Sequence, residues 1–593
     1  MKRDIEFFYG AAELESASTS SNVVETQTYP RNRLLWALVL VTVGFFGFVT
    51  LSIYDVAKKE SVSNVIKEAT PVSGMKEDSF SELKVDDAGT SEIPNIIFLL
   101  IDDQGHNDMP YVNPQLEGLM PNIKALADEG IKFTQYYTES LCTPARAALM
   151  TGKYSIHTGM QHELVGSNQH WGLPLGQPIL PEILEHHGYT RRMVGKWHLG
   201  FFHPAYIPTN RGFESHLGYF GGQENYYAHS EPLDTIVWKD WFRDGYPEEI
   251  SSEYDGGYSL SLFAQEVDEI LISHDQSKPL FLYYATQATH APLSDPPRHY
   301  LTDEEILYIQ ALTGNDDDNL SQRDLFLRTS VALDKTIGQM IETLKATGMY
   351  ENTIILAGSD NGGCAYYGGS NYPLRGEKRT QWEGGVRTNG FVHSPLLSDE
   401  VKGTTFTDLF HVTDWIPTII YGILGNSTQT ERKYDGVNQW DAIQGLSKTK
   451  RKQILYNIEI MNTTDDSFIC AYRDGPFKLV YGEVEMDIFT PIIKEDFNYC
   501  ESDGSYGTQS TSLFNIPEDG SENINIVEAV EDGQLSAMWN AIDGFFTSSV
   551  KSAYDDSDDF RYYKTWLDHD RYTVPWYHYR EDQLREHLPD PYW

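Results

Sequence analysis

The chain is poor in cysteine and in basic residues. Four cysteines in 593 residues are too few for a disulfide-stabilised scaffold, so the fold must depend on a hydrophobic core. There are 45 Lys and Arg against 87 Asp and Glu, giving a net charge of -42. This balance argues against a nucleic-acid partner, which needs a basic surface. An anionic substrate would therefore need a local cationic pocket that overcomes the field of the whole protein.

Several common functional motifs are also missing. There is no HExxH, no paired CxxC, no P-loop and no GxGxxG, so zinc hydrolase, nucleotide hydrolase and dinucleotide-binding functions lack support. Cys470 and Cys500 are close enough in sequence to form a plausible bridge, but the pairing among Cys364, Cys470 and Cys500 stays open. The acidic run at 315–319 lacks calcium-loop spacing and indicates a solvated loop.

An apolar segment near the start of the chain indicates a membrane anchor. Residues 34–53 form a run of 20 residues without a charge, long enough to cross a bilayer as a helix, after a polar tail at 1–33. Three N-glycosylation sequons lie downstream, at Asn319, Asn426 and Asn462. We therefore expect a single-pass type II membrane protein of the secretory pathway (Golgi, cell surface or lysosome), with a cytosolic tail, a signal-anchor and a lumenal or extracellular catalytic domain.

The rest of the chain divides into three parts. Residues 54–93 are polar and predict a stem. Residues 94–445 alternate short apolar runs with helical patterns, which predicts an α/β domain around a mostly parallel sheet. Residues 446–593 contain shorter runs and many turn residues, which predicts a smaller C-terminal domain with a short antiparallel sheet.

Chemically active residues follow the predicted strands. The strand at 95–100 leads to Asp102 and Asp103, and the strand at 353–359 leads to Asp360 and Asn361. Two further strands lead to Lys196 with His198 and to His290. Ligands of open α/β sheets bind outside the carboxyl ends of the strands, so we expect these groups to share one crevice. The three Asp and one Asn offer only oxygen ligands, which suit Ca²⁺ or Mg²⁺ better than zinc.

Two further segments bear on such a crevice. The Gly-rich stretch 371–387 contains Arg375, Lys378, Arg379 and Arg387, and predicts an anion-binding loop to which Lys196 and Arg146 would add. In the other, "LCTPARAALMTGKY" at 141–154, Pro144 predicts the first turn of a helix that ends near Gly152. Cys142 would then lie at a helix N-terminus, which makes a thiol of low pKa plausible. A soft thiolate nevertheless fits poorly beside hard-cation ligands.

The stretch Cys142-Thr143-Pro144-Ala145-Arg146, followed by "LMTGKY", resembles the C-x-P-x-R signature of the type I, formylglycine-dependent sulfatases. The resemblance continues through "IIFLLIDDQG", "GYTRRMVGKWHLG", "PLFLYYATQATHAPL", "AGSDNGG" and "PLRGEKRTQWEGGVR", and covers roughly residues 94–445. It is strongest toward the arylsulfatase B (N-acetylgalactosamine-4-sulfatase), I and J members. Two departures are Ala145, where the commonest version has Ser, and the membrane anchor.

The resemblance implies an alkaline-phosphatase-like sandwich and a sulfuric ester hydrolase that acts on a sulfated sugar, a glycosaminoglycan or an aryl sulfate. It implies one Ca²⁺ per chain and conversion of Cys142 to formylglycine (3-oxoalanine) by the formylglycine-generating enzyme. The implied ligands are Asp102, Asp103, Cys142, Asp360 and Asn361. The hydrated aldehyde would attack sulfur, and its second hydroxyl would then allow sulfate to leave.

The same resemblance implies roles for the remaining site residues. Arg146 and His198 would hold and activate the hydrate, Lys196 and Lys378 would neutralise the sulfate, and His290 would protonate the departing alcohol. Two alternatives remain. One is a phosphoester or phosphonate hydrolase of the alkaline phosphatase superfamily, and the other is an inactive membrane-anchored protein that binds sulfated glycans.

Overall fold

The structure is a computed structural model. It describes residues 91–233, 236–247, 257–426, 434–462, 467–483 and 509–555, together with scattered positions between 557 and 576. The predicted cytosolic tail, membrane span and most of the stem lie outside these ranges. Among the helices in the described ranges, none is both long and apolar enough to cross a membrane.

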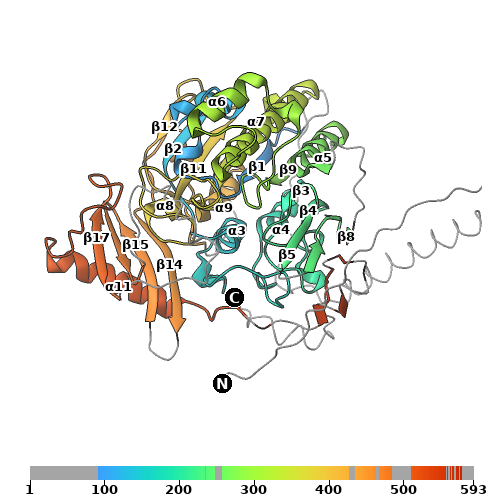
Figure 1. The fold of residues 1–593 in the computed structure, drawn as a ribbon. Helices are drawn as coiled ribbons and strands as arrows, with labels where there is room; N and C mark the ends of the chain where they lie inside the picture. Colours follow the sequence, from blue (N-terminus) through green and yellow to red (C-terminus); the bar gives the residue numbers. More distant parts are fainter. Residues whose placement is uncertain are drawn as a thin grey trace, which may run out of the picture. The chain divides into compact units, whose positions relative to one another are not determined.

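A large mixed sheet organises the first part of the chain (Figure 1). Its centre consists of five parallel strands in the order β10-β1-β9-β3-β4, with bounds β1 Asn95–Ile101, β3 Thr190–Lys196, β4 Ser215–Tyr219, β9 Leu280–Ala285 and β10 Thr353–Ser359. The remaining strands flank this centre: β2 Ile131–Tyr137, β7 Phe242–Arg243, β8 Tyr246–Pro247, β11 Arg387–His393, β12 Thr405–Phe406 and β13 Phe410–His411. β5 (Ser230–Leu233) and β6 (Ile236–Lys239) form a separate hairpin.

The four strands predicted from apolar runs are confirmed as β1, β3, β9 and β10. All seven residues of β1 are buried, as expected for a strand covered on both faces. Successive residues point to opposite faces, so Phe98 and Leu100 enter one hydrophobic core while Leu99 and Ile101 enter the other.

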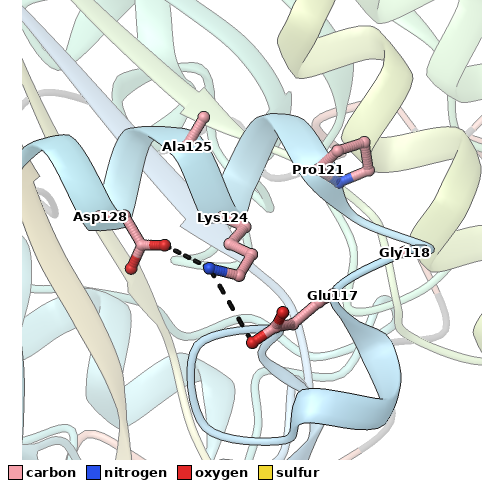
Figure 2. A pocket seen from close by; sticks show the side chains of 6 residues that line it. All are labelled: Glu117, Gly118, Pro121, Lys124, Ala125 and Asp128. Atoms are coloured by element: carbon pink, nitrogen blue, oxygen red, sulfur yellow. Dashed lines mark hydrogen bonds and ion pairs between the residues drawn. The ribbon is translucent and has the colours of Figure 1, made fainter.

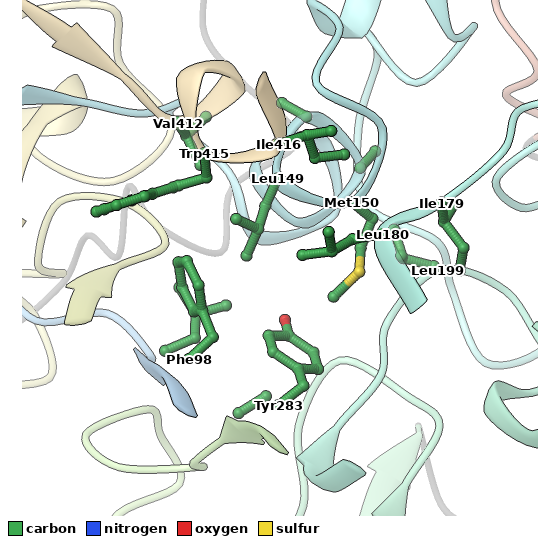
Figure 3. Close-up of a cluster of buried hydrophobic side chains, with 14 of the residues drawn as sticks. Phe98, Leu149, Met150, Ile179, Leu180, Leu199, Tyr283, Val412, Trp415 and Ile416 are labelled. Carbon is green, nitrogen blue, oxygen red and sulfur yellow. The ribbon is translucent and has the colours of Figure 1, made fainter. Parts of the chain in front are cut away.

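Helices cover both faces of the sheet. One core contains α2 (Pro121–Glu129), α5 (Ser259–Ser273), α6 (Asp303–Thr313) and α7 (Gln322–Ala346). The other contains α3 (Cys142–Thr151), α4 (Leu180–Glu185), α9 (Trp415–Pro417) and α10 (Trp440–Ile443). Figure 3 shows the second core, where Leu149 and Met150 of α3 meet Phe98 and Tyr283 of the sheet and Trp415.

A second sheet follows in the C-terminal part. It is antiparallel, in the order β14 (Gln453–Asn462), β15 (Ser467–Asp474), β16 (Phe477–Tyr481) and β17 (Thr511–Asn515). One face packs on α11 (Asp532–Ser548) and the other packs against Tyr137, Trp382 and Val386 of the first part. The predicted fold class is therefore confirmed: a mostly parallel sheet between helices, with a small antiparallel sheet after it. The predicted domain boundaries remain predictions.

The cysteines correct one expectation. Cys364 is disulfide-bonded, whereas Cys142 and Cys470 are free and buried. The bridge between Cys470 and Cys500 is therefore wrong, because Cys470 on β15 packs among apolar side chains with Met538 of α11. Cys500 lies outside the described residues.

A buried ionic cluster joins the two sheets. Lys478 Nζ on β16 lies 3.0 Å from Glu383 Oε1 on α8 (Glu383–Val386) and 2.9 Å from Glu522 Oε1, and all three side chains are fully buried. Tyr137 Oη donates to Glu383 Oε2 at 2.9 Å, and the Glu383 amide donates to Glu522 at 2.7 Å. Since unpaired buried charges are strongly unfavourable, this cluster is stable only when it is complete.

Lys478→Met should lower the free energy of unfolding by about 3–5 kcal/mol, because it removes the cation that Glu522 shares with Glu383 and leaves Glu383 with Arg387 alone, 3.6 Å away. Urea denaturation followed by fluorescence measures this. Lys402→Met, which removes an exposed pair with Asp399, is the control and should change stability little. Equal stability of Lys478→Met and the unsubstituted protein would show that the cluster contributes nothing to holding the sheets together.

Candidate active site

The groups predicted to converge do converge, at the carboxyl edge of four neighbouring parallel strands. Asp102 and Asp103 follow β1, Asp360 follows β10, Lys196 ends β3, and His290 follows β9 by five residues. These strands are adjacent and parallel, so their carboxyl ends open on one side of the sheet. Two further groups enter from outside the sheet, Arg146 from α3 and Lys378 from the loop after β10.

Each carboxylate of the site has a cationic partner. Lys196 Nζ lies 2.7 Å from Asp102 Oδ2, Lys378 Nζ lies 2.7 Å from Asp103 Oδ2, and an Arg146 Nη lies 2.9 Å from Asp360 Oδ2. The side chains are between 0% and 5% exposed, so neither the acids nor the bases are solvated. Three negative and three positive groups thus form a nearly neutral polar centre inside the protein.

The pKa values reflect these pairs. Burial alone would raise the pKa of Asp102, but Lys196 holds it below its ordinary value. Asp103 likewise has a lowered pKa: burial would raise it, but Lys378 and the neighbouring basic groups His290 and Lys196 together outweigh that effect. Burial and the neighbouring Asp102 raise the pKa of Asp360 in spite of Arg146.

Cys142 is the first residue of α3, as the sequence predicted. Pro144 lies in the first turn, and the helix ends at Gly152, whose φ of 67° is left-handed. The Cys142 sulfur lies 3.6 Å from Asp102 Oδ1 and 4.0 Å from Asp103 Oδ1, and the residue is fully buried.

The prediction that Cys142 has a thiol of low pKa is wrong. Burial raises the pKa of Cys142, and the charge of Asp360 raises it further. A neutral thiol in this position is a poor nucleophile.

Several of these groups can share one cation. The possible ligand atoms of Asp102, Asp103, Cys142 and His290 all lie within 4.8 Å of one another. Asn361 is also adjacent, because its Nδ2 donates to Asp103 Oδ1 at 2.7 Å. Its Oδ1 is buried and accepts no hydrogen bond in the described part of the chain, which leaves an oxygen available for a metal. A set dominated by carboxylate and amide oxygens fits a hard divalent cation.

Two histidines, His290 and His198, lie at the site and differ in their hydrogen bonds and backbone conformation. His290 Nδ1 lies 2.5 Å from the Ala291 carbonyl, which can only accept, so Nδ1 carries the proton. His290 Nε2 then accepts from Lys378 Nζ at 3.0 Å. His198 adopts a left-handed φ of 57° and is 2% exposed. Burial and the charge of Lys196 hold the pKa of His198 well below its usual value, so its ring is neutral.

Some residues that shape the site were not predicted. Thr143 Oγ1 donates to the His198 carbonyl at 3.1 Å and so ties α3 to the end of β3. Gly222 lies against the His198 ring, and a Cβ there would be 2.9 Å from Cε1 and Nε2. The paired glycines of "FGGQENYY" are a signal for such a close approach, although glycine pairs in turns are common.

The basic loop is only partly an anion-binding loop. Lys378 reaches the site, but Arg375 donates to the Glu522 carbonyl at 3.0 Å and stacks on Trp382. Arg387 lies 3.6 Å from Glu383. The expectation that Arg375 and Arg387 add to the anion-binding charge is therefore wrong, since both bind groups of the cluster around Glu383 and Glu522. Arg379 pairs with Glu163 instead.

A shallow surface hollow beside α2 is separate from this site (Figure 2). It is lined by Glu117, Gly118, Pro121, Lys124, Ala125 and Asp128. Its one cation, Lys124, pairs with Asp128 and with Glu117, so the hollow offers no surplus charge to a ligand. The buried charged groups of the site described above all lie at the ends of the strands instead.

The part of the chain that carries this site resembles known proteins. A family model described as Sulfatase matches residues 94–421. Arylsulfatase J from Mus musculus is 40% identical over 378 residues, which is 63% of this chain and 60% of that protein. N-acetylgalactosamine-6-sulfatase from Homo sapiens is 30% identical over 376 residues, 59% of this chain and 66% of that protein. The chain thus spans less than two thirds of either relative's length.

Solved structures share the fold. The crystal structure of Ps i-CgsB has a TM-score of 0.63 at 24% identity, and the match covers 81% of this chain and 98% of the Ps i-CgsB chain. The PsFucS1 sulfatase from Pseudoalteromonas sp. has a TM-score of 0.60 at 21% identity, covering 79% and 93%. At these identities the likeness concerns the architecture, and it agrees with the alkaline-phosphatase-like fold expected from the sequence.

Proposed function

Because the chain belongs to the sulfatase family, we propose that it hydrolyses sulfate esters of sugars or aryl alcohols. The observation that supports this most is the position of Cys142, at the start of α3 and within 4.0 Å of two strand-end carboxylates. The names of the curated relatives, an arylsulfatase and an N-acetylgalactosamine-6-sulfatase, favour a sulfated carbohydrate or an aryl sulfate.

Cys142 would act in a modified form. A buried neutral thiol is not suited to attack sulfur, and a thiolate would face Asp102 and Asp103. Conversion of Cys142 to formylglycine by the formylglycine-generating enzyme would supply a hydroxyl nucleophile there. Arg146 and His198 would orient this group, since Arg146 is held by Asp360 and the His198 backbone is held by Thr143.

The residues present at the site are chemically suited to bind Ca²⁺. Asp102, Asp103 and the modified Cys142 would bind together with Asp360 and Asn361, whose Oδ1 lacks a partner within the described residues. When bound, Ca²⁺ would polarise the sulfate oxygens and favour deprotonation of the attacking hydroxyl. Asp360 Oδ2 would continue to accept a hydrogen bond from Arg146, which leaves Oδ1, now hydrogen-bonded to the Asp103 amide, to face the ion.

Two lysines and one histidine would complete the reaction. Lys196 and Lys378 stand beside the carboxylates and would balance the sulfate charge in the transition state. His290 Nε2 accepts a hydrogen bond from Lys378 Nζ at 3.0 Å, so a proton would pass from the Lys378 ammonium to Nε2 and from Nε2 to the departing alkoxide. His290 would be neutral before and after this step, and Lys378 would regain its proton from water.

Protein made in a secretory host should hydrolyse an aryl sulfate much faster than the matching aryl phosphate. Mass spectrometry should show the Cys142 peptide lighter than a cysteine peptide, as formylglycine requires. Cys142→Ala should lose turnover by at least about a thousandfold, because it removes the nucleophile. Cys470→Ala, at a second cysteine that is free and buried among the described residues, is the matched control and should keep activity.

The opposite outcomes separate the alternatives. Faster turnover of the aryl phosphate would support the phosphoester or phosphonate hydrolase. Turnover of neither ester, with an unmodified thiol at Cys142, would support a protein that only binds sulfated glycans.

Calcium should stabilise the folded protein at this site. At a concentration of 100 times Kd the stabilisation is about 2.7 kcal/mol, which a thermal scan with Ca²⁺ or with a chelator detects. Asn361→Ala should lose most of the calcium-dependent difference. Asp318→Asn, in the acidic loop at 315–319, should keep it. A calcium effect that vanishes in Asp318→Asn and survives in Asn361→Ala would place the ion elsewhere.

We also propose that residues 34–53 anchor the chain in a membrane of the secretory pathway, with the catalytic part lumenal or extracellular. The uncharged run and the three downstream sequons support this. After alkaline carbonate extraction the full chain should remain in the membrane pellet, and Val43→Arg combined with Phe46→Arg should release it. Release of the unsubstituted chain would contradict an anchor.

A further inference from the structure

An ion pair beside the site has an unusual backbone. Arg379 and Glu163 form a salt bridge, and both have left-handed backbones, with φ of 80° and 53°. A side chain other than glycine in this conformation costs on the order of 1 kcal/mol or more, so it persists where the surroundings impose it. Asp103 and His198, both in the active site, share this property with φ of 57° each.

The two loops that carry this pair are fastened to either side of Cys142. The Arg379 amide donates to the Ser140 carbonyl at 2.8 Å, two residues before Cys142. Val165, close to Glu163, donates its amide to Thr143 Oγ1 at 3.3 Å, one residue after Cys142. The pair therefore links two loops that meet beside the start of α3. Arg379 also directly follows Lys378, whose Nζ binds Asp103.

Arg379 differs from the other cations of the region in its access to solvent. The side chains of Arg146 and Lys196 are fully buried and that of Lys378 is 5% exposed, and each is held by a carboxylate of the site. Arg379 is 11% exposed and its partner Glu163 is 23% exposed. Replacing Glu163 by an external anion would therefore leave no buried charge unpaired.

The chemistry of Arg379 narrows what such an anion would be. A guanidinium offers two parallel N–H donors and binds planar carboxylates or the oxygens of a sulfate in a bidentate manner. The protein carries a net charge of -42, so a substrate with more than one negative group needs a local cation for each.

We propose that Arg379 recognises a second anionic group of the substrate, a carboxylate or a further sulfate on the sugar unit next to the scissile sulfate. Glu163 holds the guanidinium in the free protein and is displaced when the substrate binds. This inference rests on the proposed sulfatase function. It makes the natural substrate an acidic oligosaccharide rather than an isolated monosulfated sugar.

Turnover of four sulfate esters tests the proposal. They are an aryl sulfate, a sulfated disaccharide with a uronate carboxylate, the same disaccharide with the carboxylate reduced to an alcohol, and a disulfated disaccharide without a carboxylate. In Arg379→Gln the ratio of kcat/KM for a doubly anionic disaccharide to kcat/KM for the aryl sulfate should fall at least about tenfold, through KM. Comparison of the uronate and disulfated substrates identifies the anion.

Two further variants sharpen the test. Glu163→Gln should lower KM for the doubly anionic substrate, because the competing internal carboxylate is gone. Arg191→Gln is the matched control: Arg191 is 12% exposed, pairs with Glu214 and lies near the start of β3, at the opposite end from Lys196. In Arg191→Gln the ratio of kcat/KM for the doubly anionic disaccharide to kcat/KM for the aryl sulfate should not change.

An equal loss on all four esters in Arg379→Gln, or no loss on any, would overturn the proposal, because the pair would then only connect the two loops. If the unsubstituted protein hydrolyses no sulfate ester, the proposed function fails. Calorimetric binding of the same disaccharides to Cys142→Ala, with and without Arg379→Gln, then decides the inference separately. Binding that does not depend on Arg379 would overturn it.

Discussion

The mutual neutralisation of three buried carboxylates and three buried cations is the constraint on which the site depends. Asp102, Asp103 and Asp360 could not remain charged inside the protein without Lys196, Lys378 and Arg146. The three cations come from three different places in the chain: the end of β3, the loop after β10, and α3. All three carboxylates are therefore paired only when each of these elements is in place.

This neutralisation also explains how a strongly acidic protein can receive an anion. In the free site each lysine or arginine is balanced by its own carboxylate, so the site holds no large surplus of positive charge. A divalent cation bound by Asp103 and Asn361 would change the balance, since the lysines would then face an anion beside a doubly charged ion. Attraction of the substrate would thus depend on the metal rather than on the protein's own field.

The C-terminal sheet takes part in the same arrangement. Lys478 of β16 and Glu522 hold Glu383, which lies five residues after Lys378. Arg375, on the other side of Lys378, also binds the Glu522 carbonyl. The loop that brings Lys378 to Asp103 is therefore held at both ends by contacts with the second sheet or with the segment that follows β17. The small sheet is part of the support of the active site.

How far the sequence could predict this protein depends on the range of the interactions involved. The four central strands and α3 were predictable, because apolar runs, Pro144 and Gly152 act locally. The positions of Asp102, Asp360 and His290 followed from those strands, since parallel strands place their ends on one edge. The fates of Arg375, Arg387 and Cys470 were not predictable. Arg375 binds the Glu522 carbonyl and Cys470 packs beside Met538, and both partners are far away in the chain. Arg387 pairs with Glu383, four residues before it, but Glu383 is itself held by Lys478 and Glu522. The local sequence around a basic residue or a cysteine does not show such contacts.

The sequence by itself determined the parallel core, the oxygen-rich groups at its edge and the cysteine signature, because apolar runs and the residues that directly follow them are local features of the sequence. Only the tertiary structure decided that Cys142 is a neutral buried thiol, since the desolvation that raises its pKa comes from the packing around it. The tertiary structure likewise decided that Arg379 meets Glu163. That contact joins two loops more than 200 residues apart, and it exists because both are fastened to the start of the same helix.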